Sequence, residues 1–187
     1  DLIKIIIDNI EKESAVISTT GMCSRELYEY REKTSSVRDF MCVGCMGHTS
    51  SIGLGVSLNY DKQTYVLDGD GSILMHMGSM AINGQFAGKN FKHILLNNGA
   101  HDSVGGQKTV GYDISFNDLA KSQGYKVIKC HNYNNEYEIK ETIEQLNKTD
   151  GPVFLELRCC KGARKDLGRP KTRPFENKKF FQDHLNN

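Results

Sequence analysis

The sequence predicts an α/β fold in which an open, mostly parallel sheet carries helices on both faces. Two observations predict it. Short apolar, β-branched segments alternate along the chain with segments of helical periodicity. In the middle of the chain, residues 65–67 and 93–96 are apolar, and the Met-rich stretch 71–86 between them has helical spacing. A strand–helix–strand unit of this kind places its two strands side by side and parallel.

The first part of the chain predicts a strand between two helices. The spacing of apolar residues predicts a short helix over residues 1–9. Along one side of this helix lie Leu2, Ile5, Ile6 and Asn9. Residues 15–19 read as a buried strand that ends at Thr20-Gly21. Gly21 permits a sharp loop over a ligand, although an ordinary turn fits equally well. A short helix begins at Arg25.

A helix rich in small residues follows at 48–58. Gly53 and Gly55 reduce its intrinsic stability, so we expect them to pack closely against the sheet or a ligand. Just before it, Cys42 and Cys45 form a C-x-x-C pair, which is typical of zinc or redox sites. Zinc needs a second, suitably spaced ligand pair, and we find none. Packing is therefore the favoured interpretation of both cysteines.

The second half of the chain continues the alternation. We expect helices over 116–123 and 137–147 and strands over 125–128 and 152–157. The helix 137–147 is amphipathic, with its charges on a solvated face. Residues 161–187 form a basic C-terminal extension, which we expect to cover an anionic site or a partner subunit.

Composition limits the function classes. The 187 residues suit one domain over 1–187, and the net charge of +1 argues against a nucleic-acid partner. No apolar run reaches the ~20 residues that span a membrane, and no signal-peptide pattern is present. Six scattered cysteines fit a reducing environment, so we expect a cytoplasmic location.

Two polar turns follow the two central strands, and they predict a metal site. Asp70 lies after the first strand and Asn98 after the second. Parallel strands end at the same edge of a sheet, so these side chains can lie close together. Carboxylate, amide and backbone oxygens suit Mg²⁺, which commonly shares its shell with phosphates. Gly71 and Ser72 open the intervening helix, and their free N–H groups would face an anion.

These turns resemble a known fingerprint. Gly69-Asp70-Gly71-Ser72, followed after about 25 residues by Asn97-Asn98, resembles the thiamine diphosphate motif of the 2-keto-acid decarboxylase superfamily. The resemblance implies thiamine diphosphate and Mg²⁺ as cofactors. It implies that Asp70, Asn98 and the carbonyl of Ala100 are the metal ligands. The implied cofactor-binding residues are Gly21, Gly44, Met46, Gly69, Asp70, Gly71, Ser72 and Asn98.

Among these, Gly44 and Met46 belong to the family segment that holds the aminopyrimidine ring. The resemblance implies that the Gly44 carbonyl accepts a bond from the 4′-amino group and that Met46 wedges the cofactor into a bent shape. Methionine is an adaptable, polarizable wedge, although simple core filling fits Met46 as well.

The loop 99–109 carries the substrate hypothesis. An imidazole, a carboxylate, hydroxyls, glycines and a lysine could receive an anion, although many such loops are only solvated. His101-Asp102-Ser103 with Gly105-Gly106-Gln107 resembles family members that act on phosphonopyruvate, and next those that act on sulfopyruvate. The resemblance implies a small anionic 2-keto acid substrate. It assigns His101 and Asp102 as catalytic residues and Ser103 and Lys108 as substrate contacts.

The resemblance also implies a missing part. Family members activate the cofactor with a glutamate from a pyrimidine-binding domain across a subunit interface, and no glutamate here matches that motif. We therefore expect a partner domain or subunit, and a homo- or hetero-oligomer that is inactive without it. A non-catalytic assembly module is the alternative. A Rossmann nicotinamide site is excluded, because Leu74 replaces the third glycine of G-x-G-x-x-G.

Overall fold

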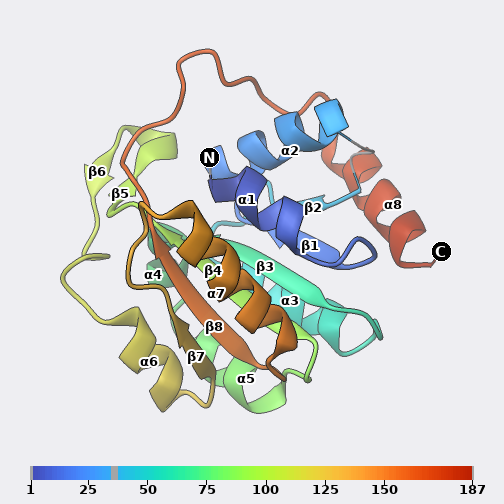
Figure 1. The fold of residues 1–187 in the computed structure, drawn as a ribbon. Coiled ribbons are helices and arrows are strands. Elements are labelled where there is room, and N and C mark those ends of the chain that lie inside the picture. Colours follow the sequence, from blue (N-terminus) through green and yellow to red (C-terminus); the bar gives the residue numbers. More distant parts are fainter. Residues whose placement is uncertain (1, 35–37, 187) are drawn as a thin grey trace.

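The computed structural model describes residues 2–34 and 38–186. Its centre is a six-stranded, wholly parallel sheet with the strand order β2-β1-β3-β4-β8-β7 (Figure 1). The predicted fold class is therefore confirmed. The strands are β1 (Ala15–Ser18), β2 (Phe40–Met41), β3 (Thr64–Gly69), β4 (Phe91–Asn97), β7 (Lys126–Lys129) and β8 (Val153–Arg158). A separate antiparallel pair joins β5 (Ala100–His101) to β6 (Gln107–Lys108).

Helices cover both faces of this sheet, as predicted (Figure 1). One face packs against α1 (Leu2–Asn9), α2 (Met22–Thr34) and α7 (Glu136–Lys148), through an apolar cluster that includes Ile6, Leu27 and Ile143. The other face packs against α3 (Thr49–Ser57), α4 (Asp70–Met75), α5 (Ser79–Phe86) and α6 (Phe116–Ser122). The chain therefore buries an apolar cluster on each side of one sheet.

Helix α1 buries only Ile6 of the residues predicted to share one side. Its buried residues are Ile3, Ile6 and Ile7, whereas Leu2 and Ile5 are only partly covered. The helix contacts both α7 and α2, so two neighbours rather than one decide which residues are inside.

The Met-rich segment is not one helix. It forms α4 and α5, separated at His76–Gly78, and Ile73 and Met80 are the buried apolar residues. Met75 is 61% exposed and Phe86 is 65% exposed, so the apolar residues with helical spacing do not share one buried face. The N–H of His76 bonds to the Ile73 carbonyl at 3.2 Å, which closes a tight turn and ends α4.

The two glycines of α3 differ. A Cβ on Gly53 would lie 2.2 Å from Cγ2 of Val66 on β3, so this glycine permits the helix to lie against the sheet, as expected. A Cβ on Gly55 would meet nothing within 4 Å, so the expected close packing is wrong there. Cys42 and Cys45 pack around α3 and α8, and burial raises the pKa of Cys42 to about 12, which favours an inert thiol.

Residues 159–173, which we call the strap, connect β8 to the last helix and include the first part of the predicted C-terminal extension 161–187. The strap has no helix or strand and runs past α2 to α8 (Pro174–Leu185) (Figure 1). Helix α8 covers the edge strand β2. Asn177 on α8 accepts a bond from the Met41 N–H at 3.0 Å and donates to the Asp39 carbonyl at 2.8 Å. One side chain thus supplies the bonds that a further strand would make.

Candidate functional site

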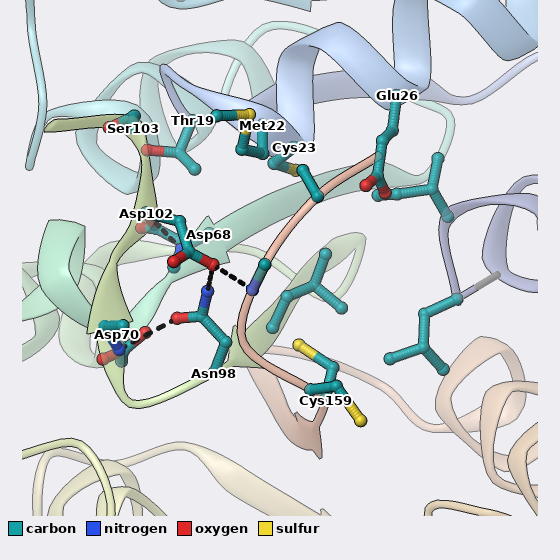
Figure 2. A pocket seen from close by; sticks show the side chains of 18 of the residues that line it. Thr19, Met22, Cys23, Glu26, Asp68, Asp70, Asn98, Asp102, Ser103 and Cys159 are labelled. Atoms are coloured by element: carbon teal, nitrogen blue, oxygen red, sulfur yellow. Dashed lines mark hydrogen bonds between the residues drawn. The ribbon is translucent and has the colours of Figure 1, made fainter. Parts of the chain in front are cut away.

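A cavity of 790 Å³ opens at the carboxyl ends of the parallel strands (Figure 2). Residues after β1, β3, β4 and β8 line it, together with side chains of α1, α2 and the strap. The next two strands in the chain, β2 and β3, lie on opposite sides of β1 in the sheet. The cavity therefore lies beside a topological switch point. Open α/β sheets bind ligands at this place.

Asp70 is positioned by the end of β3 and the start of α4. Gly69 has extended backbone angles and precedes the helix, so Asp70 is the first helical residue. Its carboxylate is buried, and one oxygen accepts a bond from the hydroxyl of Thr109. Ser72 in the same turn accepts a bond from the Gly47 N–H at 3.1 Å. The acidic side chain and the helix start therefore lie together in the cavity wall.

Asn97 and Asn98 have separate tasks. Asn97 is buried, and its amide nitrogen donates to the Gly111 carbonyl and to Glu156, each at 2.8 Å. It anchors the end of β4. Asn98 lines the cavity, and its Oδ1 accepts a bond from the Ala100 N–H at 3.1 Å. The pattern alone did not reveal the anchoring role of Asn97 or its partner Glu156.

The predicted metal ligands come together. Asp70, Asn98 and Ala100 all line the same cavity, and they offer a carboxylate, an amide oxygen and a backbone carbonyl. This donor set suits Mg²⁺. Among residues 2–34 and 38–186, no group of three His, Cys, Asp or Glu side chains forms an alternative metal cluster.

His101 lies against the glycine of the same turn. A Cβ on Gly71 would come within 2.4 Å of His101 Nδ1, so the turn needs glycine for this approach. Met46 is also adjacent, since its terminal methyl would lie 3.3 Å from that Cβ. Ser103 follows in the loop and faces Gly21, whose φ of +100° explains the glycine there. His101, Ser103 and Met46 all line the cavity.

The family follows from comparison with known proteins. Residues 17–157 match the family described as "Thiamine pyrophosphate enzyme, C-terminal TPP binding domain". The chain belongs to this family. The predicted resemblance is confirmed, and the family description makes thiamine diphosphate the ligand of this kind of domain.

Two relatives have names that refine the comparison. The chain is 36% identical over 177 residues to a phosphonopyruvate decarboxylase of Streptomyces viridochromogenes. The matched region covers 95% of this chain and 43% of the relative. It is 36% identical over 160 residues to the sulfopyruvate decarboxylase subunit beta of Methanocaldococcus jannaschii, covering 85% of this chain and 78% of that subunit. The chain thus spans less than half of the Streptomyces relative.

Solved structures support the fold. Benzoylformate decarboxylase from Polynucleobacter necessarius superposes with a TM-score of 0.69 over 87% of this chain and 33% of its own, at 15% identity. At this identity the likeness shows the fold alone. In the described residues, no helix is both long and apolar enough to cross a membrane.

Two residues that we predicted to contact a ligand, Gly44 and Lys108, do not line the cavity. Gly44 is exposed with φ of +69°, and the described residues that line the cavity do not include it. Lys108 is exposed and pairs with Asp113 at 3.1 Å. Both positions remain predictions as ligand contacts.

Sequence reasoning missed Glu26 and Cys159. Both line the cavity, and burial raises the pKa of each side chain, for Cys159 to about 12. A carboxyl group with a shifted pKa in a cleft, like that of Glu26, is typical of functional sites, whereas the raised pKa keeps the Cys159 thiol protonated and unreactive, as for Cys42. Glu26 stands inside an unremarkable helical pattern, so only the folded structure brings it into the cavity.

Proposed function

We propose that residues 1–187 form the thiamine diphosphate- and Mg²⁺-binding domain of a decarboxylase that converts 3-phosphonopyruvate to phosphonoacetaldehyde and CO₂. One observation carries the proposal. Asp70, Asn98 and Ala100, from the ends of two neighbouring strands, line one cavity in a chain that matches a phosphonopyruvate decarboxylase over 95% of its length.

In this proposal the chain's own residues hold the cofactor by its diphosphate end. Asp70, Asn98 and the Ala100 carbonyl would ligate Mg²⁺, and the turn Gly69–Ser72 would face the phosphates. Met46, which lines the cavity, would support the rings. The cofactor, when bound, supplies an electron sink for the carbon that loses CO₂.

The loop after β5 would receive the substrate. His101 lies in the cavity wall against Gly71, where an imidazole can deliver a proton to the product carbon. Ser103 is in reach of the same space, and Lys108 would contribute only after it leaves Asp113. We assign His101 as the proton donor.

The proposal requires a second domain. The chain covers less than half of a longer relative, which supports a partner domain or subunit, and we propose that this partner supplies the activating glutamate. We propose a homo- or hetero-oligomer in the cytoplasm. Sulfopyruvate is the second candidate substrate, because the chain covers 78% of a sulfopyruvate decarboxylase beta subunit at 36% identity.

The first experiment is calorimetric titration of thiamine diphosphate into the chain, with and without Mg²⁺. We expect Mg²⁺-dependent binding that Asp70→Ala abolishes. Asp61→Ala, which removes an exposed carboxylate from a distant turn, is the control and should leave binding intact. The titration is repeated with a pyrimidine-binding domain added, since that domain completes the site.

A decarboxylation assay of the same mixture separates the substrates. Release of phosphonoacetaldehyde from phosphonopyruvate only when both parts are present supports the proposal, and faster turnover of sulfopyruvate would favour the second candidate. Absence of Mg²⁺-dependent binding, both alone and with the partner, would contradict the cofactor assignment.

A further inference from the structure

Asp102 lies between the predicted metal site and the strap. One of its carboxylate oxygens, Oδ2, accepts two hydrogen bonds (Figure 2). The first comes from the amide nitrogen of Asn98 at 2.7 Å, and the second comes from the backbone N–H of Gly162 at 2.7 Å. A single oxygen thus joins the end of β4 to residues 159–173.

The bond to Asn98 has a consequence for metal binding. A side-chain amide has one end that donates and one that accepts, and only the oxygen can ligate a cation. An acceptor at Asp102 fixes Nδ2 on its own side, and the Ala100 N–H holds Oδ1 on the other. The two bonds together select one of the two amide orientations.

The bond to Gly162 has a consequence for the strap. Other side-chain contacts of the strap are exposed. Arg164 pairs with Glu29 at 2.6 Å and Lys171 pairs with Glu32 at 2.8 Å on the surface of α2, and Lys161 donates to the Gly106 carbonyl. Exposed ion pairs contribute little to stability. Gly162 is exposed as well, but it lines the cavity and its backbone N–H bonds to Asp102, a side chain that also bonds to the predicted metal ligand Asn98.

We propose that Asp102 is a positioning residue that orients the Asn98 amide for the metal and ties the strap to the site. Binding of Mg²⁺ and diphosphate is then coupled to docking of the strap, because both depend on the same carboxylate oxygen. The metal part of this inference rests on the proposed function. In this inference Asp102 positions other groups and transfers no proton. His101 is then the only proton donor that we assign.

A pair of substitutions distinguishes positioning from acid–base chemistry. Asp102→Ala removes the acceptor for both donors. Asp102→Asn keeps one oxygen at the end of a side chain of the same shape, and this oxygen can accept both bonds. An acid–base residue would lose its function in either variant, whereas a positioning residue is rescued by asparagine.

The binding experiment titrates Mg²⁺ into the chain with thiamine diphosphate, plus a pyrimidine-binding domain if the chain alone binds weakly. Changing a group that orients a metal ligand typically costs 10–100-fold in metal affinity, so we expect about that loss for Asp102→Ala. We expect Asp102→Asn to retain most of the affinity. Asp61→Ala and Asp61→Asn make the same two changes at an exposed turn and should alter nothing.

The second readout needs no ligand. In ¹⁵N spectra, hydrogen exchange of the Gly162 amide and of the Asn98 side-chain amide should accelerate in Asp102→Ala and stay near native in Asp102→Asn. If native protein binds no metal, the proposed function fails, yet these amides still decide the positioning role. Unchanged exchange in Asp102→Ala, or equal losses in both variants, would overturn the inference.

Discussion

Lys92 shows how a single buried residue can make stability depend on pH. It lies at the start of β4, at the opposite end of the strand from the cavity. Its side chain is buried and donates to the carbonyl of Thr149, just after α7. Burial, which removes the ammonium group from water, lowers the pKa of Lys92 to about 8.

The sign of the resulting pH dependence follows from proton binding. In the unfolded chain a lysine has a pKa of about 10.4, so between roughly pH 8 and pH 10 the unfolded state holds the proton more tightly. Stability from this group therefore rises with pH in that window. We expect the unfolding free energy of native protein, minus that of Lys92→Met, to increase from pH 8 to pH 10 in urea titrations.

The matched control is Lys89→Met, which changes an exposed lysine three residues earlier. Its difference from native protein should stay constant over the same pH range. A constant difference for Lys92→Met as well would show that this lysine has an ordinary pKa in the folded protein.

At the site, sequence reasoning predicted the common location of residues that stand in a local motif. Asp70 and Asn98 each follow a strand, and parallel strands bring such positions to one edge of the sheet. The buried bond of Asn97 to Glu156 and the exposed bond of Asp102 to Gly162 each join segments about 60 positions apart. No spacing rule predicts such pairs, because tertiary packing alone brings them together.

At the scale of elements, α3 and β3 offer a matched test of helix-to-sheet contact. A Cβ at Gly53 would overlap Val66, whereas a Cβ at Gly55 would lie in open space. We expect Gly53→Ala to destabilise the protein by about 1–3 kcal/mol, the usual cost of overpacking a core. Gly55→Ala should instead stabilise it by about 0.5–1 kcal/mol, because alanine favours helix. Chemical denaturation measures both.

The two substitutions control for each other, since both add one methyl group to the same helix. Equal effects of the same sign would show that helix propensity, rather than contact with Val66, governs this helix.

Strands were more predictable than helix boundaries. The apolar runs identified β1, β3, β4 and β8, because burial on both faces selects continuous apolar segments. The predicted strand 125–128 overlaps β7, which has exposed lysines at both ends. The break between α4 and α5 escaped prediction. His76 lies in that break, and its ring stacks on His48 at 4.6 Å, a contact between separate segments that helical periodicity does not reveal.

At the scale of the whole molecule, the first and last parts of the chain meet at β2. Asn177 on α8 is buried and pairs with the backbone of Met41 and Asp39. Removing it leaves a buried N–H and a buried carbonyl unpaired, each at a cost of about 1–3 kcal/mol. We expect Asn177→Ala to lower the unfolding free energy by about 2–4 kcal/mol, measured by urea denaturation.

Lys178→Ala is the control for that substitution. It also replaces a polar side chain by alanine on α8, but at an exposed position. If Asn177→Ala is as mild as Lys178→Ala, the side chain is not an essential part of the contact between α8 and β2.

The order of the strands was beyond the reach of pattern reasoning. Periodicity indicated a parallel sheet with helices on both faces, and the structure has this architecture. It did not indicate that β8 inserts between β4 and β7, or that α8 returns to β2. These placements depend on which apolar faces fit one another over the whole chain.

The covering of β2 by α8 also bears on the order in which the protein is made. Met41 and its partner Asn177 are 136 positions apart. At about 5–20 residues per second, a ribosome adds that many residues in roughly 7 to 27 seconds. Throughout this interval α8 has not been made and does not cover β2, and an uncovered edge strand is the kind of surface that pairs with strands of other chains. Protection from aggregation at this edge is therefore acquired late in translation.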